Sequence, residues 1–206
     1  EIIHPMSDTL DLLRAETLLL SEWKPAVLDR YFLIKRLHNQ DKQFVLTPDF
    51  QRAYAGYYGM SRFTTQEFRK AYFRLLHDEQ SDLVYILREL YKYPAPNNIN
   101  RVEFSFATKL LNTLDATLPI YDVNVALVLN LEPPRGDTID ARIASCLATY
   151  DNLKRSCADL ISTPEAIHII EQVRKLYPDF DELDIPDERV LDIILWKIGS
   201  RLKKHK

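Results

Sequence analysis

Apolar residues recur at helical spacing through almost the whole chain, and no run alternates between apolar and polar residues as a half-buried strand does. Helix-start signals divide this pattern into segments. Thr47-Pro48 and Thr163-Pro164 each place a capping residue before a proline at the first helical position, and Thr64 with Glu67 forms a capping-box pattern. The sequence therefore predicts an all-α protein of about ten helices with no sheet.

Single residues indicate further boundaries. We expect helices to begin at Ser7, Pro25, Ser81, Asp137 and Asp187. Pro94 and Pro96 interrupt the helical pattern. The last helix is predicted to turn one apolar side to the core, formed by Val190, Leu191, Ile194, Leu195 and Ile198.

The composition is that of a globular protein with a large core, because 46% of the 206 residues are hydrophobic and only four are glycine. No apolar run approaches ~20 residues, so no membrane span is predicted. The net charge of −3 argues mildly against nucleic acid, although DNA binding needs only a local basic face. No two of the five histidines have metal-ligand spacing, so no metal site is predicted among His4, His38, His77, His168 and His205.

The chain has two cysteines, Cys146 and Cys157, within one helix-like stretch. About three helical turns separate them, or ~16 Å, which is too far for a disulfide within a helix. We expect two reduced core thiols in a reducing cytosol.

Two short elements carry the most chemical information. The first, Ser105-Phe106-Ala107-Thr108-Lys109, reads as the opening turns of a helix that carries a lysine. The second, Pro119-Ile120-Tyr121-Asp122-Val123-Asn124-Val125, is an extended stretch that leads to an aspartate and a new apolar helix. Asp122 is thus predicted at or next to a helix N-terminus, where free N–H groups and the helix dipole favour a negative charge. The alternative is that Asp122 only caps the helix, because Asp is among the best N-caps.

This pair of elements resembles the core of the helix-hairpin-helix DNA glycosylases. Ser105-Phe106-Ala107 stands where that superfamily has a Gly-hydrophobic-Gly hairpin turn, and Lys109 stands at its lysine. Residues 119–125 are similar to its Pro-Ile/Val-x-Asp element, above all the adenine-glycosylase version with Asn two residues after Asp. Two departures are plain: residues 105 and 107 are not glycine, and the Lys-to-Asp spacing is shorter by roughly one and a half helical turns. The hairpin turn lies either here or earlier, near residues 94–98.

The resemblance implies an all-α fold of about ten helices in two lobes around a central cleft. Residues 1–206 would form one compact domain, with roughly 60–130 as the hairpin lobe and 1–59 plus 131–206 as the second lobe. It also implies excision of a modified base from double-stranded DNA by N-glycosidic bond hydrolysis, either a damaged base in repair or a bulky modified cytosine in phage DNA. We expect a monomer in the bacterial cytosol without a cofactor, since two cysteines cannot hold a four-cysteine iron–sulfur cluster.

The resemblance assigns a role to Asp122 as the catalytic carboxylate. Lys109 is a second catalytic candidate as a Schiff-base nucleophile, and it could instead hold a DNA phosphate or pair with a surface carboxylate. A base lifted out of the duplex needs aromatic faces to stack on, and the alternative for such aromatic residues is ordinary core packing. The predicted base-binding residues are Tyr57, Tyr58, Phe63 and Asn124. The predicted DNA contacts are Arg62, Arg69, Arg101, Ser105 and Thr108.

Two other functional classes fit the same sequence. A non-catalytic helical module that binds DNA or protein would keep the fold and bury Asp122 as a satisfied cap, whereas an enzyme needs Asp122 in an open cleft. A regulatory domain that contacts protein would carry its aromatic residues on a flat exposed patch.

Overall fold

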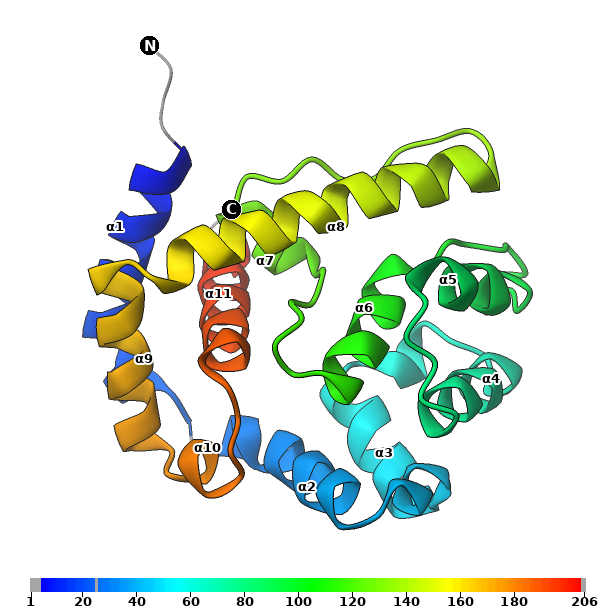
Figure 1. The fold of residues 1–206 in the computed structure, drawn as a ribbon, viewed down its shortest axis with the longest axis horizontal. Coiled ribbons are helices and arrows are strands. Elements are labelled where there is room, and N and C mark those ends of the chain that lie inside the picture. The colour runs from blue at the N-terminus through cyan, green and yellow to red at the C-terminus, as the bar shows by residue number, and fades with distance from the viewer. Residues whose placement is uncertain (1–4, 25, 205–206) are drawn as a thin grey trace. The chain divides into compact units, whose positions relative to one another are not determined.

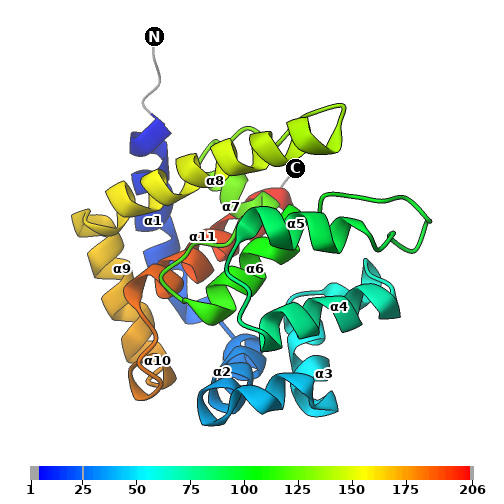
Figure 2. The same ribbon diagram turned by 45° about the vertical axis from the view of Figure 1, so that its right-hand side comes forward.

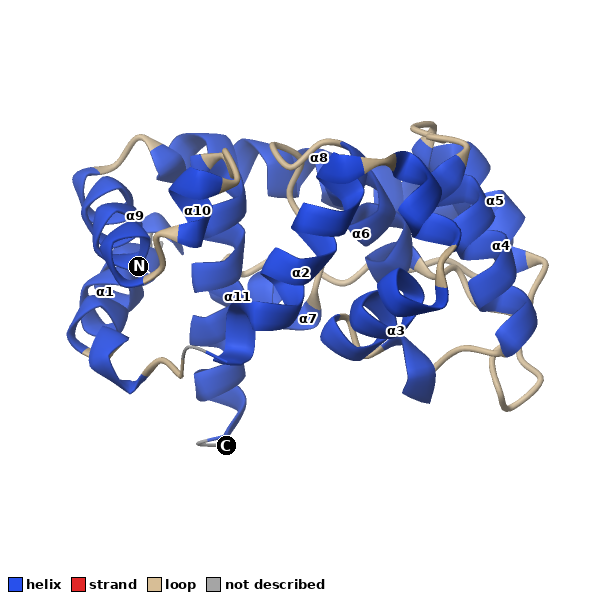
Figure 3. Ribbon diagram, turned by 90° about the horizontal axis from the view of Figure 1, so that it is seen from below, coloured by secondary structure: helices blue, strands red, loops and turns tan. Residues whose placement is uncertain are grey.

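The computed structural model describes residues 5–24 and 26–204, and every regular element in these ranges is a helix. Figure 3, coloured by secondary structure, shows blue helices joined by tan loops. The structure confirms the predicted all-α fold, with eleven α-helices and three short 3₁₀ segments in the described ranges. None of these helices is long and apolar enough to cross a membrane.

The helices belong to two compact units (Figure 1). The first unit combines Glu1–Trp23 with Asp115–Lys206, and the second unit is Lys24–Leu114. The first unit contains α1 (Pro5–Leu18), η1 (Leu20–Glu22), α7 (Val123–Val128), α8 (Ile139–Ile161), α9 (Pro164–Leu176), α10 (Asp179–Glu182) and α11 (Asp187–Lys204). The second unit contains α2 (Ala26–Gln40), η2 (Lys42–Leu46), α3 (Pro48–Tyr57), η3 (Met60–Arg62), α4 (Gln66–His77), α5 (Leu83–Tyr91) and α6 (Phe104–Leu114).

The unit boundaries differ from those expected near residues 60 and 130. Helix α2 packs on α3 and η2, so the segment before residue 60 belongs with α4, α5 and α6. Helix α7 packs along α11, which places it with the C-terminal helices. Contacts between helices therefore set the boundaries, and local helix signals do not encode them.

In the first unit, α1 lies alongside α9, and α11 contacts both helices (Figures 1 and 2). The predicted core side of α11 is confirmed, because the five apolar residues expected there are all buried: Val190, Leu191, Ile194, Leu195 and Ile198. Helix α11 is thus central to the core of this unit, and it also carries Asp192, which accepts the N–H of Ile120.

The second unit has an aromatic core. Phe50 and Tyr54 on α3 stack with ring centroids 5.6 Å apart, and Phe73 on α4 meets both rings edge-on. All three side chains are buried. Phe50 and Tyr54 are therefore core residues, which is the ordinary packing given above as the alternative to base stacking.

Two of the helix-start signals are confirmed at their predicted residues. The Thr47 hydroxyl accepts the N–H of Phe50 at 3.4 Å, and the Thr163 hydroxyl accepts the N–H of Ala166 at 3.3 Å. Each cap is followed by proline at the first helical position, as expected.

Other helix starts are displaced from their predicted residues. Three caps lie one residue later than predicted: Thr65 instead of Thr64, Asp82 instead of Ser81, and Thr138 instead of Asp137. Neighbouring Ser, Thr and Asp residues compete for this position, and Thr64 instead donates its hydroxyl to the carbonyl of Met60 at 2.8 Å. Helix α1 already begins at Pro5, so Ser7 lies inside it, and the start expected at Pro25 lies outside the described residues.

The two cysteines of α8 are free thiols. Cys146 is buried and Cys157 is half-buried. Desolvation by burial raises the pKa of the Cys146 thiol to about 11 and also raises the pKa of Cys157. A thiol is a poor nucleophile until it ionises, so neither residue has the environment of a reactive cysteine.

Candidate active site

Asp122 lies at the N-cap of α7, as predicted. Its backbone is extended, with φ −134° and ψ 148°, and its Oδ1 accepts the N–H of Asn124 at 2.8 Å. The side chain is half-buried. Among the described residues this is the one hydrogen bond of the Asp122 carboxylate, so Oδ2 has no hydrogen-bond partner there. One oxygen caps the helix, and the other remains available to a ligand.

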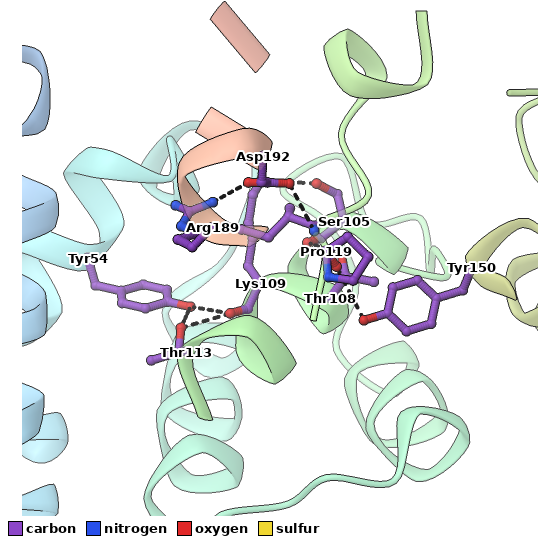
Figure 4. Close-up of polar contacts among 10 residues, drawn as sticks. Tyr54, Ser105, Thr108, Lys109, Thr113, Pro119, Tyr150, Arg189 and Asp192 are labelled. Atoms are coloured by element: carbon purple, nitrogen blue, oxygen red, sulfur yellow. Dashed lines mark hydrogen bonds and ion pairs between the residues drawn. The ribbon is translucent and has the colours of Figure 1, made fainter. Parts of the chain in front are cut away.

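Buried hydrogen bonds hold the stretch that leads to Asp122, which we call the aspartate segment (residues 119–124). The N–H of Ile120 donates to Asp192 Oδ1 at 3.1 Å, and the Tyr150 hydroxyl donates to the carbonyl of Pro119 at 3.2 Å (Figure 4). Residues 119–121 lie outside any helix, so their buried backbone groups need partners from elsewhere. Helices α11 and α8 supply them through side chains.

A glycine on α11 allows α7 to come very close. A Cβ added at Gly199 would lie 2.2 Å from the backbone oxygen of Asn124 and 2.7 Å from its Cβ. No real Cβ atom tolerates the first distance, so only glycine fits here. The close contact joins the end of the aspartate segment directly to the α11 backbone.

Asp192 forms an ion pair with Arg189, one turn earlier on α11, and both side chains are buried, with 5% and 3% exposed. The two oxygens of Asp192 have different partners: Oδ2 pairs with Arg189, and Oδ1 accepts the backbone N–H of Ile120. Burial raises the pKa of the Asp192 carboxyl above its usual range, whereas the Arg189 charge and the Ile120 N–H act in the opposite direction. The negative charge of Asp122 also raises this pKa, by less than burial does.

Lys109 lies in a cluster of aromatic and hydroxyl groups in the second unit. Its side chain is buried, with 9% exposed, and its Nζ donates to Ser105 Oγ at 3.0 Å. The Nζ atom also lies 4.9 Å from the ring centroid of Phe106 and 5.7 Å from that of Tyr58. Two of the predicted site residues, Ser105 and Tyr58, therefore meet at the Lys109 amine.

A network of tyrosine hydroxyls holds α6, the helix of Lys109. Tyr54 Oη lies 2.7 Å from Tyr72 Oη. It also lies 3.0 Å from Thr113 Oγ1 and 3.3 Å from the carbonyl oxygen of Lys109 (Figure 4). Tyr72 in turn donates to the carbonyl of Phe106 at 3.1 Å. Helices α3 and α4 thereby bind the backbone of α6 at the turn that carries Lys109.

The remaining predicted base-binding residues differ in exposure. Tyr57 and Tyr58 are half-buried at the end of α3, with ring centroids 4.8 Å apart. Phe63, directly after η3, is 61% exposed. Asn124 is half-buried in the first turn of α7, where its N–H donates to the capping carboxylate of Asp122. Asp122 and Asn124 belong to the first unit and the three aromatic residues to the second, so a shared cleft stays a prediction.

The predicted DNA contacts also divide by exposure. Arg62 and Arg101 are exposed, whereas Arg69 is half-buried and donates to the carbonyl of Thr64 at 2.8 Å. Thr108 is fully enclosed, and its hydroxyl donates to the carbonyls of Phe104 and Ser105 within α6. Thr108 is therefore the least accessible of the predicted DNA contacts.

The first of the two suggested hairpin positions is corrected. Residues 105–107 lie inside the first turns of α6, which already begins at Phe104. The turn between α5 and α6 lies earlier, where the N–H of Asn98 donates to the carbonyl of Ala95 at 2.8 Å and Asn98 adopts a left-handed φ of 60°. This is the alternative position near residues 94–98, and it explains why residues 105 and 107 need not be glycine.

Sequence reasoning missed the residues that position Asp122. Arg189, Asp192, Tyr150 and Gly199 lie far along the chain from the aspartate segment, so no spacing rule connects them. Two signals were present: a charged pair among the apolar residues of the last helix, and a glycine inside that helix. Both patterns mark a helix position with an unusual neighbour.

No match was found when the chain was compared with protein-family models, curated proteins and solved structures. In the described part of the chain, no three His, Cys, Asp or Glu side chains gather as metal ligands would. His4 and His205 lie outside that part. The chemistry of the site therefore has to be argued from Asp122, Lys109 and the groups around them.

Proposed function

We propose that this protein is a DNA glycosylase that excises a modified base from double-stranded DNA by hydrolysing its N-glycosidic bond. The observation that carries the proposal is the Asp122 carboxylate, which is half-buried and uses only Oδ1 in hydrogen bonding among the described residues. Buried bonds from α11 and α8 hold the backbone that leads to this carboxylate, which supports a fixed position for its charge. The resemblance of residues 105–125 supplies the reaction class.

The proposed chemistry needs a fixed negative charge. Cleavage of an N-glycosidic bond develops positive charge on the sugar, as in other glycoside hydrolysis. A carboxylate oxygen aimed at that charge stabilises the transition state and can also activate the attacking water. We assign this stabilising role to Asp122 Oδ2, while the bond from the Asn124 N–H to Oδ1 holds the side chain in place.

The Lys109 amine is proposed to act on the same substrate in one of two ways. As a nucleophile it would attack the sugar and form a Schiff base, which requires a neutral amine. As a cation it would hold a DNA phosphate. Its contacts with two aromatic rings and Ser105 Oγ restrict its motion, and the attraction of the ring faces is for the cation of the second role.

We propose two alternative substrates: a damaged base, or a bulky modified cytosine of phage DNA. Tyr57, Tyr58 and Phe63 offer the aromatic faces on which such a base would stack, at about 1–3 kcal/mol per base. Phe63 is the most exposed of these three residues.

The test compares the wild-type protein with Asp122→Asn on lesion-containing duplexes and on modified phage DNA, with abasic sites as the readout. Asparagine keeps one acceptor oxygen for the Asn124 N–H, so the cap and the fold should survive. It loses the charge, and we expect excision to fall by about 10²–10³-fold with DNA binding retained. The matched control is Asp115→Asn, because Asp115 is exposed and also accepts a backbone N–H two residues on, from Thr117.

Lys109→Gln separates the two roles of the lysine. If Lys109 is the nucleophile, borohydride should trap a covalent DNA complex with the wild type and not with the variant. If it holds phosphate, nothing is trapped and the variant binds DNA more weakly. An Asp122→Asn protein with full activity would refute the assignment, and a wild-type protein that binds every duplex without excising a base would be a binding module.

A further inference from the structure

Protein stability alone does not explain the buried ion pair on α11. Arg189 and Asp192 are 3% and 5% exposed, and taking two charges out of water opposes folding. Apolar residues of similar size often serve such positions as well or better. The neighbours of the pair on α11, Val190, Leu191 and Ile194, are all buried apolar residues. The pair is therefore better explained by the group that Asp192 binds with Oδ1, the oxygen that does not pair with Arg189.

That oxygen holds the backbone two residues before Asp122. Asp192 Oδ1 accepts the N–H of Ile120 at 3.1 Å, although 72 positions separate the two residues in the chain. Pro119 has no N–H of its own, so Ile120 carries the first donor of the extended stretch. Ile120 is 4% exposed, so its N–H would lack water if the carboxylate were removed.

We propose that Asp192, held by Arg189, is the positioning residue that sets where the Asp122 carboxylate lies in the reaction. This inference rests on the proposed glycosylase function. Arg189 takes one oxygen of Asp192 and fixes the direction of the other, which then fixes Ile120. Two extended residues span at most ~7 Å, so a displacement at Ile120 is passed on to Asp122.

The effect on the reaction should be large although Asp192 does not touch the substrate in this proposal. Catalysis by a fixed charge depends on its position, and a misplacement of about 1 Å can lower the rate by about 10²-fold. The other two attachments of the segment, at Pro119 and Asn124, would remain in place without Asp192. Loss of the Ile120 bond should therefore shift the segment rather than unfold it.

The test uses two double variants that both remove the buried charges. R189M/D192N keeps an amide oxygen that can accept from the Ile120 N–H, whereas R189M/D192L offers no acceptor. Neither leaves a buried charge unpaired, which removes the main cause of misfolding in a single variant. We expect a smaller loss of kcat in R189M/D192N, which keeps the acceptor but lacks the support of Arg189, than in R189M/D192L. The second variant should lose about 10²-fold in kcat with an unchanged KM for the duplex.

A second readout does not depend on activity. Hydrogen exchange of the Ile120 amide should be slow in the wild type and in R189M/D192N, and fast in R189M/D192L. Wild-type excision together with an unchanged kcat in R189M/D192L would overturn the positioning role. If no variant and no wild-type protein excises a base, the glycosylase function fails, and equal protection of Ile120 in both double variants would overturn the positioning inference separately.

Discussion

At the scale of single residues, Gly199 offers the sharpest test of the packing around Asp122. We expect Gly199→Ala to lower the free energy of unfolding by about 1–3 kcal/mol, because its Cβ would overlap the Asn124 backbone. This loss should appear although alanine is the better helix former. Urea unfolding of the wild type and the variant measures the difference.

Gly56→Ala is the matched control for this change. Gly56 is exposed in α3, and an added Cβ would meet only the flexible end of Arg30, at 3.0 Å from Nη1. This variant should be more stable than the wild type by about 0.4–1 kcal/mol. If both alanine variants gained stability, the close contact between α11 and α7 would be wrong.

His38 on α2 should make stability depend on pH. Its ring lies 6.5 Å from that of Phe50, and burial lowers the pKa of His38, helped by the charge of Lys35 and opposed by Glu79. The unfolded state then binds the proton more readily below the ordinary pKa of about 6.5. The free energy of unfolding should therefore fall as the pH is lowered from ~7 through the folded-state pKa.

Urea unfolding at neutral and mildly acidic pH measures this dependence. His38→Gln should flatten the part of the pH dependence that His38 causes. His168→Gln, which replaces an exposed histidine on α9, serves as the control. Identical pH dependence in wild type and His38→Gln would contradict the prediction.

At the scale of elements, the tyrosine network joins α3, α4 and α6. Tyr54→Phe removes the hydroxyl that contacts Tyr72 and Thr113, and leaves buried polar groups without that partner. We expect a loss of about 1–3 kcal/mol in the free energy of unfolding, because such groups keep their desolvation penalty. Tyr85→Phe on α5 is the control, since Tyr85 is 49% exposed and should tolerate the change. Equal stability of the two variants would show that the network does not hold α6.

At the scale of the whole molecule, the proposed DNA binding would have to overcome a net charge of −3. We expect duplex affinity to fall steeply with salt, with a slope of about −0.9 in log K against log salt for each neutralised phosphate. Removing the exposed cations Arg62 and Arg101 together should reduce the slope by about two such contacts. Binding at a series of salt concentrations measures it.

Arg155→Ala is the control for this measurement, because it removes an exposed cation outside the predicted set. Its salt slope should equal that of the wild type. An affinity that does not change with salt would favour a module that binds protein.

Local signals in the sequence were sufficient where a residue acts on its own helix. Thr47, Thr163 and Asp122 cap their helices as predicted, because a cap bonds an N–H only two or three residues away. The same locality accounts for the errors of one residue at Thr64 and Ser81, where a neighbour of equal capping ability takes the position. Residues 105–109 form the opening turns of a lysine-bearing helix, as predicted, whereas the hairpin turn that the resemblance placed at residues 105–107 is not there.

The sequence by itself determined that this protein is all-α, where most of its helices lie and that Asp122 begins one of them. Only the tertiary structure decided that Asp192 holds Ile120, that Tyr150 holds Pro119 and that α7 lies against Gly199. The physical reason is range. Helix periodicity and capping act within a few residues, whereas the burial of a charge and the partner of a backbone N–H depend on residues that only folding brings together.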